Sequence, residues 1–264
     1  MPDRRRHRGA HPEDAQLFSK DALPALRSAV GDLSWLLGRG YPVRAALALA
    51  GDHASLTVRQ RQAVRRCACS EAQRAERIAR SAAPEIMPGV PVWIDGFNVL
   101  TTVEAAFGGG VLLVARDGAL RDMASVHGSY RPVEETRPAI QAVAEVLEDR
   151  QVKRCRWLLD APVSNSGRLK TILLEFAAER ALAWEVDVIR DPDRLLEAAS
   201  GDVLVASADS RVMDGAQKTW QLARETVERL RPRPWIVDLA VDEYTVCGAR
   251  GGATMKSTRE NTAP

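Results

Sequence analysis

The chain is poor in cysteine and in long apolar runs, and each shortage excludes a class of protein. Four cysteines in 264 residues are too few for the disulfide framework of a small secreted protein. Cys67 and Cys69 have no second pair at zinc-binding spacing, so they do not predict a structural zinc site. No run of about 18 apolar residues occurs, so no transmembrane helix is expected. The basic first ten residues lack the apolar core of a secretory signal, which favours a reduced, cytoplasmic protein.

Motifs of several common enzyme classes are also missing. No Gly-x-Gly-x-x-Gly follows a strand-like run and no Gly-x-x-x-x-Gly-Lys-Ser/Thr loop occurs, so a nucleotide-binding fold loses its main support. The absence of Gly-x-Ser-x-Gly argues against a serine hydrolase of the α/β type. The net charge of +2 indicates no strongly basic stripe, although a local basic patch is compatible with that total.

Composition and hydrophobic periodicity divide the chain into five stretches. Residues 1–16 are polar and are expected to form a disordered leader. Apolar residues recur at steps of three and four over residues 17–82, which predicts a small helical domain. Residues 83–90 contain proline and glycine and are expected to be a linker. Residues 91–240 alternate between strand-like and helix-like patterns, and residues 246–264 are expected to form a disordered tail.

The alternation over residues 91–240 predicts an α/β fold, because it favours parallel strands with helices on both faces of the sheet. We therefore expect a Rossmann-like three-layer α/β/α sandwich with a mainly parallel sheet, preceded by the small all-α domain. Within the sandwich, residues 118–126 are expected to form a short helix. Residues 211–230 are expected to form one long helix, because their apolar residues recur at steps of three and four.

Aspartates follow the apolar runs that are expected to be strands. Asp95 ends one run and is followed by Asn98 at the start of a helix. Asp160 ends a second run, and Asp209 follows a third, with Asp214 just over one helical turn beyond. Because the carboxyl ends of parallel strands lie at one edge of a sheet, these carboxylates can converge.

Clustered carboxylates predict a site for Mg²⁺ or Mn²⁺, because a divalent cation relieves their repulsion. Such an ion can activate water for attack on a phosphodiester. We expect Asp95, Asp160 and Asp209 to bind the metal, with Asp214 as a further catalytic acid. A helix N-cap or turn residue is the more common explanation of a lone aspartate such as Asp160, and a solvated acid in the first turn of a helix explains Asp214 equally well.

A second charged group follows the next expected strand. It contains Arg116, Asp117, Arg121 and Asp122 and precedes His127 in a His-Gly-Ser-Tyr loop. Arginines can bind phosphates bidentately, but surface ion pairs between Arg116 and Asp122 and between Asp117 and Arg121 are an equal alternative. Arg168 lies near the start of a later helix, where a solvated helix face is the simpler explanation. The candidate substrate-binding residues are Asn98, Arg116, Arg121, His127 and Arg168.

Two segments resemble signatures of the PIN-like ribonuclease superfamily, especially its NYN branch. Ile94-Asp-Gly-Phe-Asn-Val99 is similar to the first strand, and Val205-Ala-Ser-Ala-Asp209 is similar to a later strand ending in Ser/Thr-x-Asp. The resemblance covers about residues 91–240. It implies a Rossmann-like fold, an acidic cluster that binds Mg²⁺ or Mn²⁺, and cleavage of RNA. By motif position, Asp95 and Asp209 would be metal ligands and Asn98 would support them.

Other positions match the superfamily less closely. Asp160 and Asp214 fit by topology more than by motif. An extra strand-helix unit and the His127 loop precede Asp160, which leaves the second acidic ligand open. Glu104, Asp117 and Asp122 are the candidates for that ligand.

The whole chain is similar to an uncharacterised family of archaeal and bacterial proteins. In that family a helical domain with a pattern like Trp35-Leu-Leu-Gly-Arg-Gly-Tyr-Pro42 precedes a domain with Asp-Gly-Phe-Asn-Val and His-Gly-Ser-Tyr. This resemblance implies a domain architecture but does not indicate which activity the protein has.

The sequence therefore predicts a metal-dependent endoribonuclease with RNA as its partner and no membrane association, and it leaves a homo-oligomer open. An alternative is a non-catalytic nucleic-acid or protein-binding module, in which arginines of the helical domain bind phosphates. A third interpretation is a phosphohydrolase that acts on small phosphate esters at the same acidic edge. The arginines considered for that role are Arg59, Arg61, Arg65, Arg66, Arg74, Arg77 and Arg80.

Overall fold

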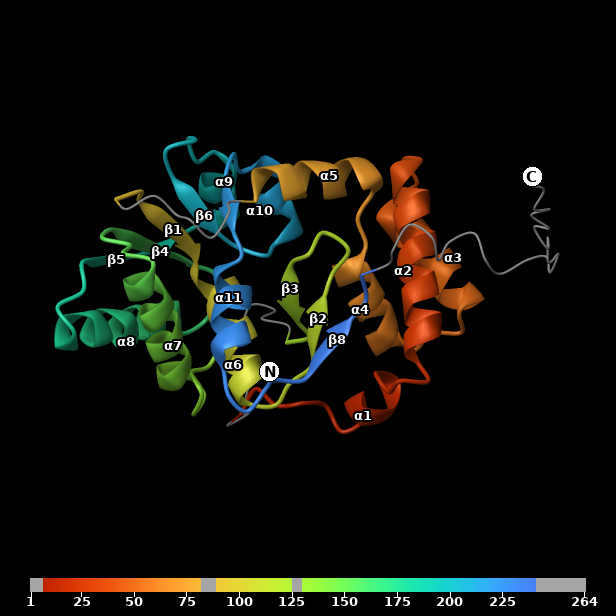
Figure 1. Cartoon of the computed structure of the whole chain (residues 1–264), viewed down its shortest axis with the longest axis horizontal. Coiled ribbons are helices and arrows are strands. Elements are labelled where there is room, and N and C mark those ends of the chain that lie inside the picture. The colour runs from red at the N-terminus through yellow and green to blue at the C-terminus, as the bar shows by residue number, and fades with distance from the viewer. Residues whose placement is uncertain (1–6, 82–88, 125–129, 241–264) are drawn as a thin grey trace, which may run out of the picture.

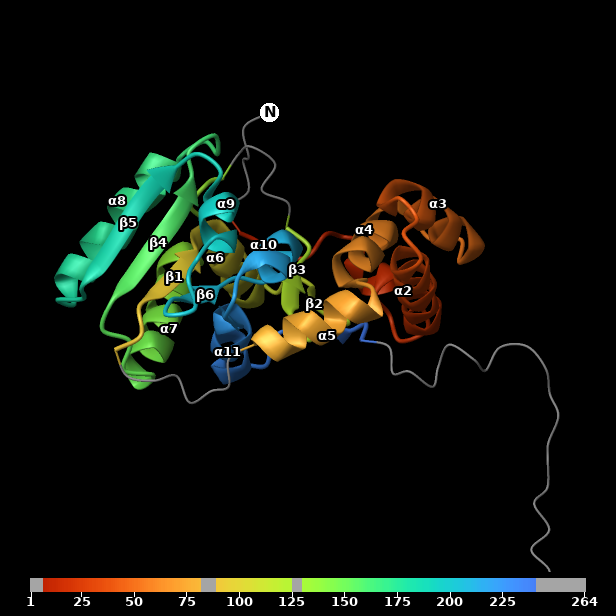
Figure 2. The ribbon, with the colours of Figure 1, turned by 90° about the horizontal axis from the view of Figure 1, so that it is seen from above.

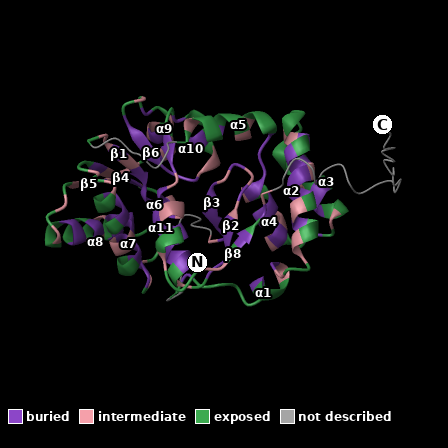
Figure 3. Cartoon of the chain, viewed as in Figure 1, coloured by how far each residue is buried: buried purple, intermediate pink, exposed green. Residues whose placement is uncertain are grey.

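The computed structural model describes residues 7–81, 89–124 and 130–240. A helical part, a small sheet and a larger parallel sheet follow one another across the molecule (Figure 1). Buried residues run continuously through all three, whereas the outer faces of the peripheral helices are exposed (Figure 3). Within the described residues, none of the helices combines the length and apolar character needed to cross a lipid bilayer.

The helical part forms because one face of each long helix is apolar. Leu26, Val30 and Leu33 recur at steps of three and four and are fully buried in a core shared with neighbouring helices. Reciprocal capping boxes at Thr57 and Ser70 fix the starts of the last two helices, because each satisfies two otherwise unpaired backbone donors. The helices are α1 (Asp14–Leu17), α2 (Leu23–Gly38), α3 (Val43–His53), α4 (Val58–Cys67) and α5 (Glu71–Arg80).

The larger sheet confirms the expected parallel α/β fold. Its strand order is β5-β4-β1-β6-β7, and each neighbouring pair is parallel. Its strands are β1 (Val92–Asp95), β4 (Cys155–Asp160), β5 (Trp184–Ile189), β6 (Leu204–Ala206) and β7 (Thr219–Trp220).

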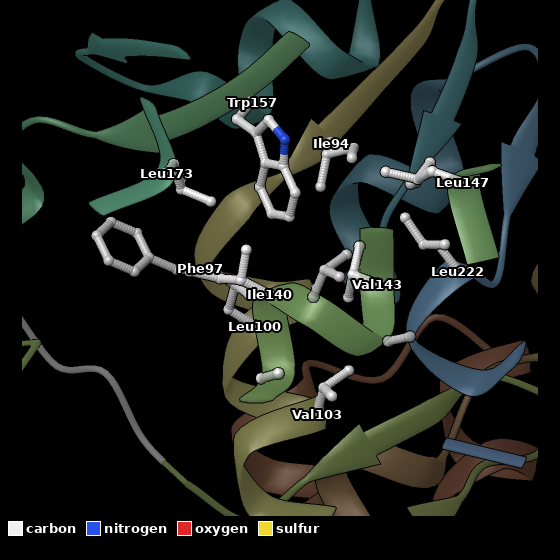
Figure 4. Close-up of a cluster of buried hydrophobic side chains, with 14 of the residues drawn as sticks. Ile94, Phe97, Leu100, Val103, Ile140, Val143, Leu147, Trp157, Leu173 and Leu222 are labelled. Atoms are coloured by element: carbon white, nitrogen blue, oxygen red, sulfur yellow. The ribbon is translucent and has the colours of Figure 1, made fainter. Parts of the chain in front are cut away.

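Helices cover both faces of the larger sheet, as a three-layer sandwich requires (Figure 2). Ile94 and Trp157 pack on one face with side chains of four helices (Figure 4), whereas Leu158 and Val205 pack on the other face with two short helices. This alternation follows from the two-residue period of a strand. The first set is α6 (Gly96–Phe107), α7 (Thr136–Asp149), α8 (Ser166–Glu179) and α11 (Leu222–Arg229), and the second is α9 (Pro192–Glu197) and α10 (Ser210–Gly215).

A separate three-stranded sheet connects the two cores. Its order is β3-β2-β8, with β2 antiparallel to β3 and parallel to β8. Leu113 and Val237 belong to the core of the helical part, whereas Leu112 and Leu120 belong to the core of the sandwich. The strands are β2 (Leu112–Val114), β3 (Leu120–Asp122) and β8 (Ile236–Asp238). This sheet couples the helical part to the sandwich through shared apolar packing.

Two expected helices are wrong. Part of residues 118–126 forms strand β3, because Leu120 and Asp122 pair with β2 across a turn at Gly118, whose φ is +79°. The expected helix over residues 211–230 is divided into α10, β7 and α11. α10 ends at Gly215, where an added Cβ would lie 2.8 Å from the Glu197 Cβ. This close approach of α9 and α10 diverts the chain into β7.

The expected leader is ordered over residues 7–16, which corrects that prediction. Arg8 is 2% exposed and forms an ion pair with the buried Glu104. The buried Asp14 accepts a hydrogen bond of 2.7 Å from Arg59. The ion pairs of Arg8 with Glu104 and of Asp14 with Arg59 attach residues 7–16 to the rest of the fold. Residues 1–6, most of the expected linker and the expected tail lie outside the described residues.

Candidate functional site

Asp95 lies at the carboxyl end of β1 and caps helix α6. One oxygen accepts the Asn98 backbone N–H at 3.4 Å, and Oδ2 accepts the Ser207 hydroxyl at 2.7 Å. Burial raises the pKa of Asp95 to about 7. The Ser207 hydrogen bond opposes this rise, and the negative charges of Asp193 and Asp209 reinforce it. The carboxyl group therefore changes protonation near neutral pH.

Asp209 is held beside Asp95 by the loop that follows β6. Its carboxylate caps α10 by accepting the N–H groups of Arg211 at 2.8 Å and Val212 at 3.3 Å. Its own N–H donates to the Ser207 hydroxyl at 3.0 Å. Asn98 fixes the same loop, because its Oδ1 accepts the N–H of Ala208 at 2.8 Å. Thus three residues expected at the site, Asp95, Asn98 and Asp209, lie in one hydrogen-bonded unit.

Asp193 is an acid of this edge that the sequence interpretation missed. It lies at the start of α9, two residues after a left-handed Asp191. Burial raises its pKa to about 6, reinforced by Asp209, Asp191 and Asp160 and opposed by Arg211. The available signal was Asp191-Pro192-Asp193 directly after the apolar run of β5, because proline is favoured in the first helical turn.

Asp160 lies at the same edge, at the end of β4. It is two residues beyond Leu158, the partner of Asp95 in the parallel register. Its Oδ1 is buried and has no hydrogen-bond partner among the described residues. A buried carboxylate oxygen without a donor is costly, so this atom is suited to a cationic or donor ligand.

The four acids do not form a closed metal cage. Among the described residues, no group of three or more Asp, Glu, His or Cys side chains is arranged to hold a metal ion. Mg²⁺ is often bound through one or two carboxylates, with waters and substrate phosphates completing its coordination. The unpartnered oxygen of Asp160 and the raised pKa values of Asp95 and Asp193 fit that open type of site.

Asp214 is directed toward the helical part instead of joining this group. It accepts hydrogen bonds from Arg77 at 2.6 and 2.9 Å and from Gln73 at 3.0 Å. Asp117 is buried against the same Arg77 at 2.7 Å and against Arg121 at 2.7 Å. Burial would raise the pKa of Asp117, but the two guanidinium groups outweigh it and lower the pKa to about 2. Both acids are neutralised by arginine.

The other two candidates for the second ligand also have their own partners. Glu104 is fully buried and accepts hydrogen bonds of 2.6 Å from both Tyr130 and Thr136, besides its ion pair with Arg8. Asp122 accepts hydrogen bonds from the hydroxyls of Thr101 at 3.2 Å and Thr102 at 3.0 Å. Its Oδ1 has no partner among the described residues.

The remaining candidate substrate contacts are dispersed. Arg116 donates to Glu71 at 2.5 Å, so its expected pairing with Asp122 is wrong. Arg121 is buried against Asp117, so the second expected ion pair exists but is internal and not at the surface. Arg168 is exposed on α8. His127 lies outside the described residues.

A cleft of about 970 Å³ opens beside Asp209, between the helical part and the sandwich. One wall belongs to α4 and α5, and the other belongs to α6, β3 and α10. Its charged and amide-bearing lining residues are Gln62, Arg65, Arg66, Gln73, Arg77, Asn98, Arg121, Asp122, Glu197, Asp209, Arg211 and Asp214.

Sequence comparisons relate the chain to two families. Residues 84–225 match the family described as domain of unknown function DUF5616, and residues 25–80 match the family described as protein of unknown function DUF434. The uncharacterized protein MJ0935 of Methanocaldococcus jannaschii is 27% identical over 211 residues, which cover 79% of this chain and 100% of that protein. No solved structure matches significantly.

Proposed function

This chain belongs to the DUF5616 family, and we propose that it is a divalent-metal-dependent endoribonuclease. The reaction is phosphodiester hydrolysis at the edge formed by Asp95, Asp160, Asp193 and Asp209. The observation that carries the proposal is the joining of Asp95 and Asp209 through Ser207, with burial and mutual repulsion raising the pKa of Asp95 to about 7. A bound cation would relieve the electrostatic repulsion between these two carboxylates.

Asp95 and Asp209 would hold Mg²⁺ or Mn²⁺, with Asp160 as a further ligand. When bound, the ion supplies an activated water and neutralises charge on the phosphate. The chain keeps the two carboxylates in place through the Ser207 hydroxyl and the Asn98 amide oxygen. Asp193, with a pKa of about 6, is suited to accept a proton near neutral pH, because a catalytic base works best when its pKa is near the working pH.

RNA is the proposed substrate, and the resemblance of the β1 and β6 segments to PIN-like ribonucleases supports it. We also infer a cytoplasmic location. Cys67, Cys69 and Cys155 are buried free thiols, as expected of a protein in a reducing compartment.

The test is cleavage of a fluorescently labelled RNA by the purified full chain with Mn²⁺, Mg²⁺ or EDTA. We expect cleavage that depends on the metal and is reduced at least roughly hundredfold in Asp95→Asn and Asp209→Asn, because metal catalysis supplies several kcal/mol. Asp52→Asn is the matched control, since its carboxylate is exposed in the helical part. Absence of metal-dependent cleavage of any RNA or DNA would refute the proposal. Turnover of a generic phosphate ester without RNA cleavage would indicate a phosphohydrolase instead.

A further inference from the structure

We propose that the cleft beside Asp209 binds the phosphate backbone of single-stranded RNA through Arg65 and Arg66 of α4. This inference rests on the proposed nuclease function and assigns the helical part its role in that function. The supporting observation is that five arginines of the helical part form ion pairs within the chain, whereas Arg65 and Arg66 line the cleft without an ion pair.

Five of the ten arginines in residues 17–82 form ion pairs with acids of the same chain. Arg77 forms the most extensive ion pairs, with Asp117 and Asp214. The other internal pairs are Arg59 with Asp14, Arg61 with Asp52, Arg74 with Glu71, and Arg80 with Glu76. These five guanidinium groups stabilise the fold and are poorly available to a ligand.

Arg65 and Arg66 differ from those five. Within residues 7–81, 89–124 and 130–240, the exposed Arg65 side chain has no hydrogen bond or ion pair, and Arg66 donates only to the carbonyl of Ala124 at 3.3 Å. Both line the cleft. Of the helical part's arginines that line the cleft, they are therefore the ones that can bind phosphate without breaking an ion pair within the chain.

Helix α4 holds these two arginines in a fixed orientation. Ala63, Val64 and Cys67 are buried in the core of the helical part, so the helix cannot rotate without exposing them. Gln62, Arg65 and Arg66 have the i, i+3 and i+4 spacing of one helix face, and all three line the cleft. This face presents two cations and one amide to a ligand.

The two walls of the cleft have opposite unpaired charges. Three other lining arginines pair with acids: Arg77 with Asp214, Arg121 with Asp117, and Arg211 with Glu197. On the wall opposite α4, Asp209 and Asp122 have no ion pair among the described side chains. A polyanion beside α4, with a metal at the opposite carboxylates, would neutralise both walls.

The size of the cleft favours a single strand. Its volume of about 970 Å³ is at the upper end of the ~300–1,000 Å³ typical of ligand pockets. It can enclose a short length of one strand but not the width of a duplex. Positively charged surfaces such as the α4 wall are the usual way in which proteins follow a single-stranded backbone.

Binding of a fluorescein-labelled single-stranded RNA to the full chain, measured by anisotropy in EDTA, tests the proposal without cleavage. We expect Arg65→Gln to weaken binding about five- to tenfold near 0.1 M salt and to reduce the slope of log K against log salt by about 0.7, since one phosphate contact is lost. The control Arg154→Gln makes the same charge change at an exposed position before the amino end of β4, at the edge of the sheet opposite the proposed site, and should bind like the wild type. Thermal unfolding of Arg65→Gln should be unchanged.

Three results would overturn the proposal: no RNA binding by the wild type, unchanged affinity and salt slope in Arg65→Gln, or an equal loss in Arg154→Gln. A duplex of the same sequence that binds at least as tightly would also contradict it. Asp95→Asn separates the two proposals, because it should bind RNA normally without cleaving it. Normal RNA binding that depends on Arg65, in a protein that cleaves nothing, would refute the nuclease function alone.

Discussion

The Ser207 hydroxyl donates a 2.7 Å hydrogen bond to Oδ2 of Asp95. The Ser207 hydroxyl oxygen also accepts the N–H of Asp209 at 3.0 Å, so the Ser207 side chain connects the ends of β1 and β6. Its hydrogen bond favours the ionised form of Asp95 and thus opposes the rise in pKa that burial causes. Ser207 therefore acts as a positioning residue of the proposed site.

Ser207→Ala should move the pH dependence of cleavage. Without the hydroxyl, the pKa of Asp95 rises further above 7, so the acid limb of the rate profile should shift upward by roughly one pH unit. This estimate follows because a hydrogen bond to a charged group contributes ~1.5–3 kcal/mol and one pKa unit equals ~1.4 kcal/mol. Rates of RNA cleavage measured between pH 5 and 9 would test this. A lower rate with an unchanged profile would show that Ser207 does not act on Asp95 ionisation.

Asp95→Asn should stabilise the metal-free protein at alkaline pH. The folded-state pKa of about 7 exceeds the ordinary value of 3.8, so the folded state binds the proton more tightly. Stability is therefore lost as pH rises from about 4 to 7, and the full penalty persists above pH 7. At pH 8 the variant should unfold with a free energy up to roughly 4 kcal/mol higher than the wild type, because each pKa unit between 3.8 and about 7 corresponds to ~1.4 kcal/mol.

Urea unfolding in EDTA at pH 4 and pH 8 measures this effect. The advantage of Asp95→Asn should be present at pH 8 and absent at pH 4, whereas Asp52→Asn should show no such dependence. Equal stability of wild type and Asp95→Asn at both pH values would contradict the raised pKa.

Arg77→Ala should destabilise the fold strongly, because Arg77 neutralises the buried Asp117 as well as Asp214. Breaking a buried ion pair from one side costs about 3–5 kcal/mol. Asp214→Asn should cost only about 1 kcal/mol, since its carboxylate is 38% exposed, and it should retain metal-dependent cleavage. Urea unfolding and cleavage assays compare the two variants. Loss of cleavage in a folded Asp214→Asn protein would instead make Asp214 part of the catalytic site.

Arg8→Met should also destabilise the protein, by about 3 kcal/mol, because Glu104 would remain buried without its cation. Adding Glu104→Gln should recover part of the loss, since the neutral amide can still accept hydrogen bonds from Tyr130 and Thr136. A double-mutant cycle by urea unfolding gives the coupling between the two residues. Independent, additive effects would show that residues 7–16 are not anchored by this pair.

The sequence predicted those features that depend on local pattern. The strand of residues 92–95 is an apolar run that ends on Asp95, and Asn98 follows it at the start of a helix, so both the fold and the site could be located there. Asp209 was predictable for the same reason. Their convergence follows from parallel pairing, because all strands of such a sheet end at one edge.

Features that depend on a pairing partner were not predictable in this way. Asp214 was expected near the start of a helix, but it lies near the end of α10, where Arg77, 137 residues away in the sequence, neutralises it. Strand β3 is defined by pairing with β2 and not by an apolar run of its own. Arg8 has a polar neighbourhood in the sequence, and only the tertiary structure reveals its contact with Glu104. At each of these positions, a partner that the local pattern does not specify determined the outcome.

The parallel pairing of β2 with β8 has a consequence for biosynthesis. Val237 packs in the same core as Leu26 and Leu33, although more than 200 residues of chain separate them. During synthesis, the first helices lack the packing contact with Val237 until the segment around residue 237 has been made. A fragment ending before Trp235 would leave that apolar surface open to water.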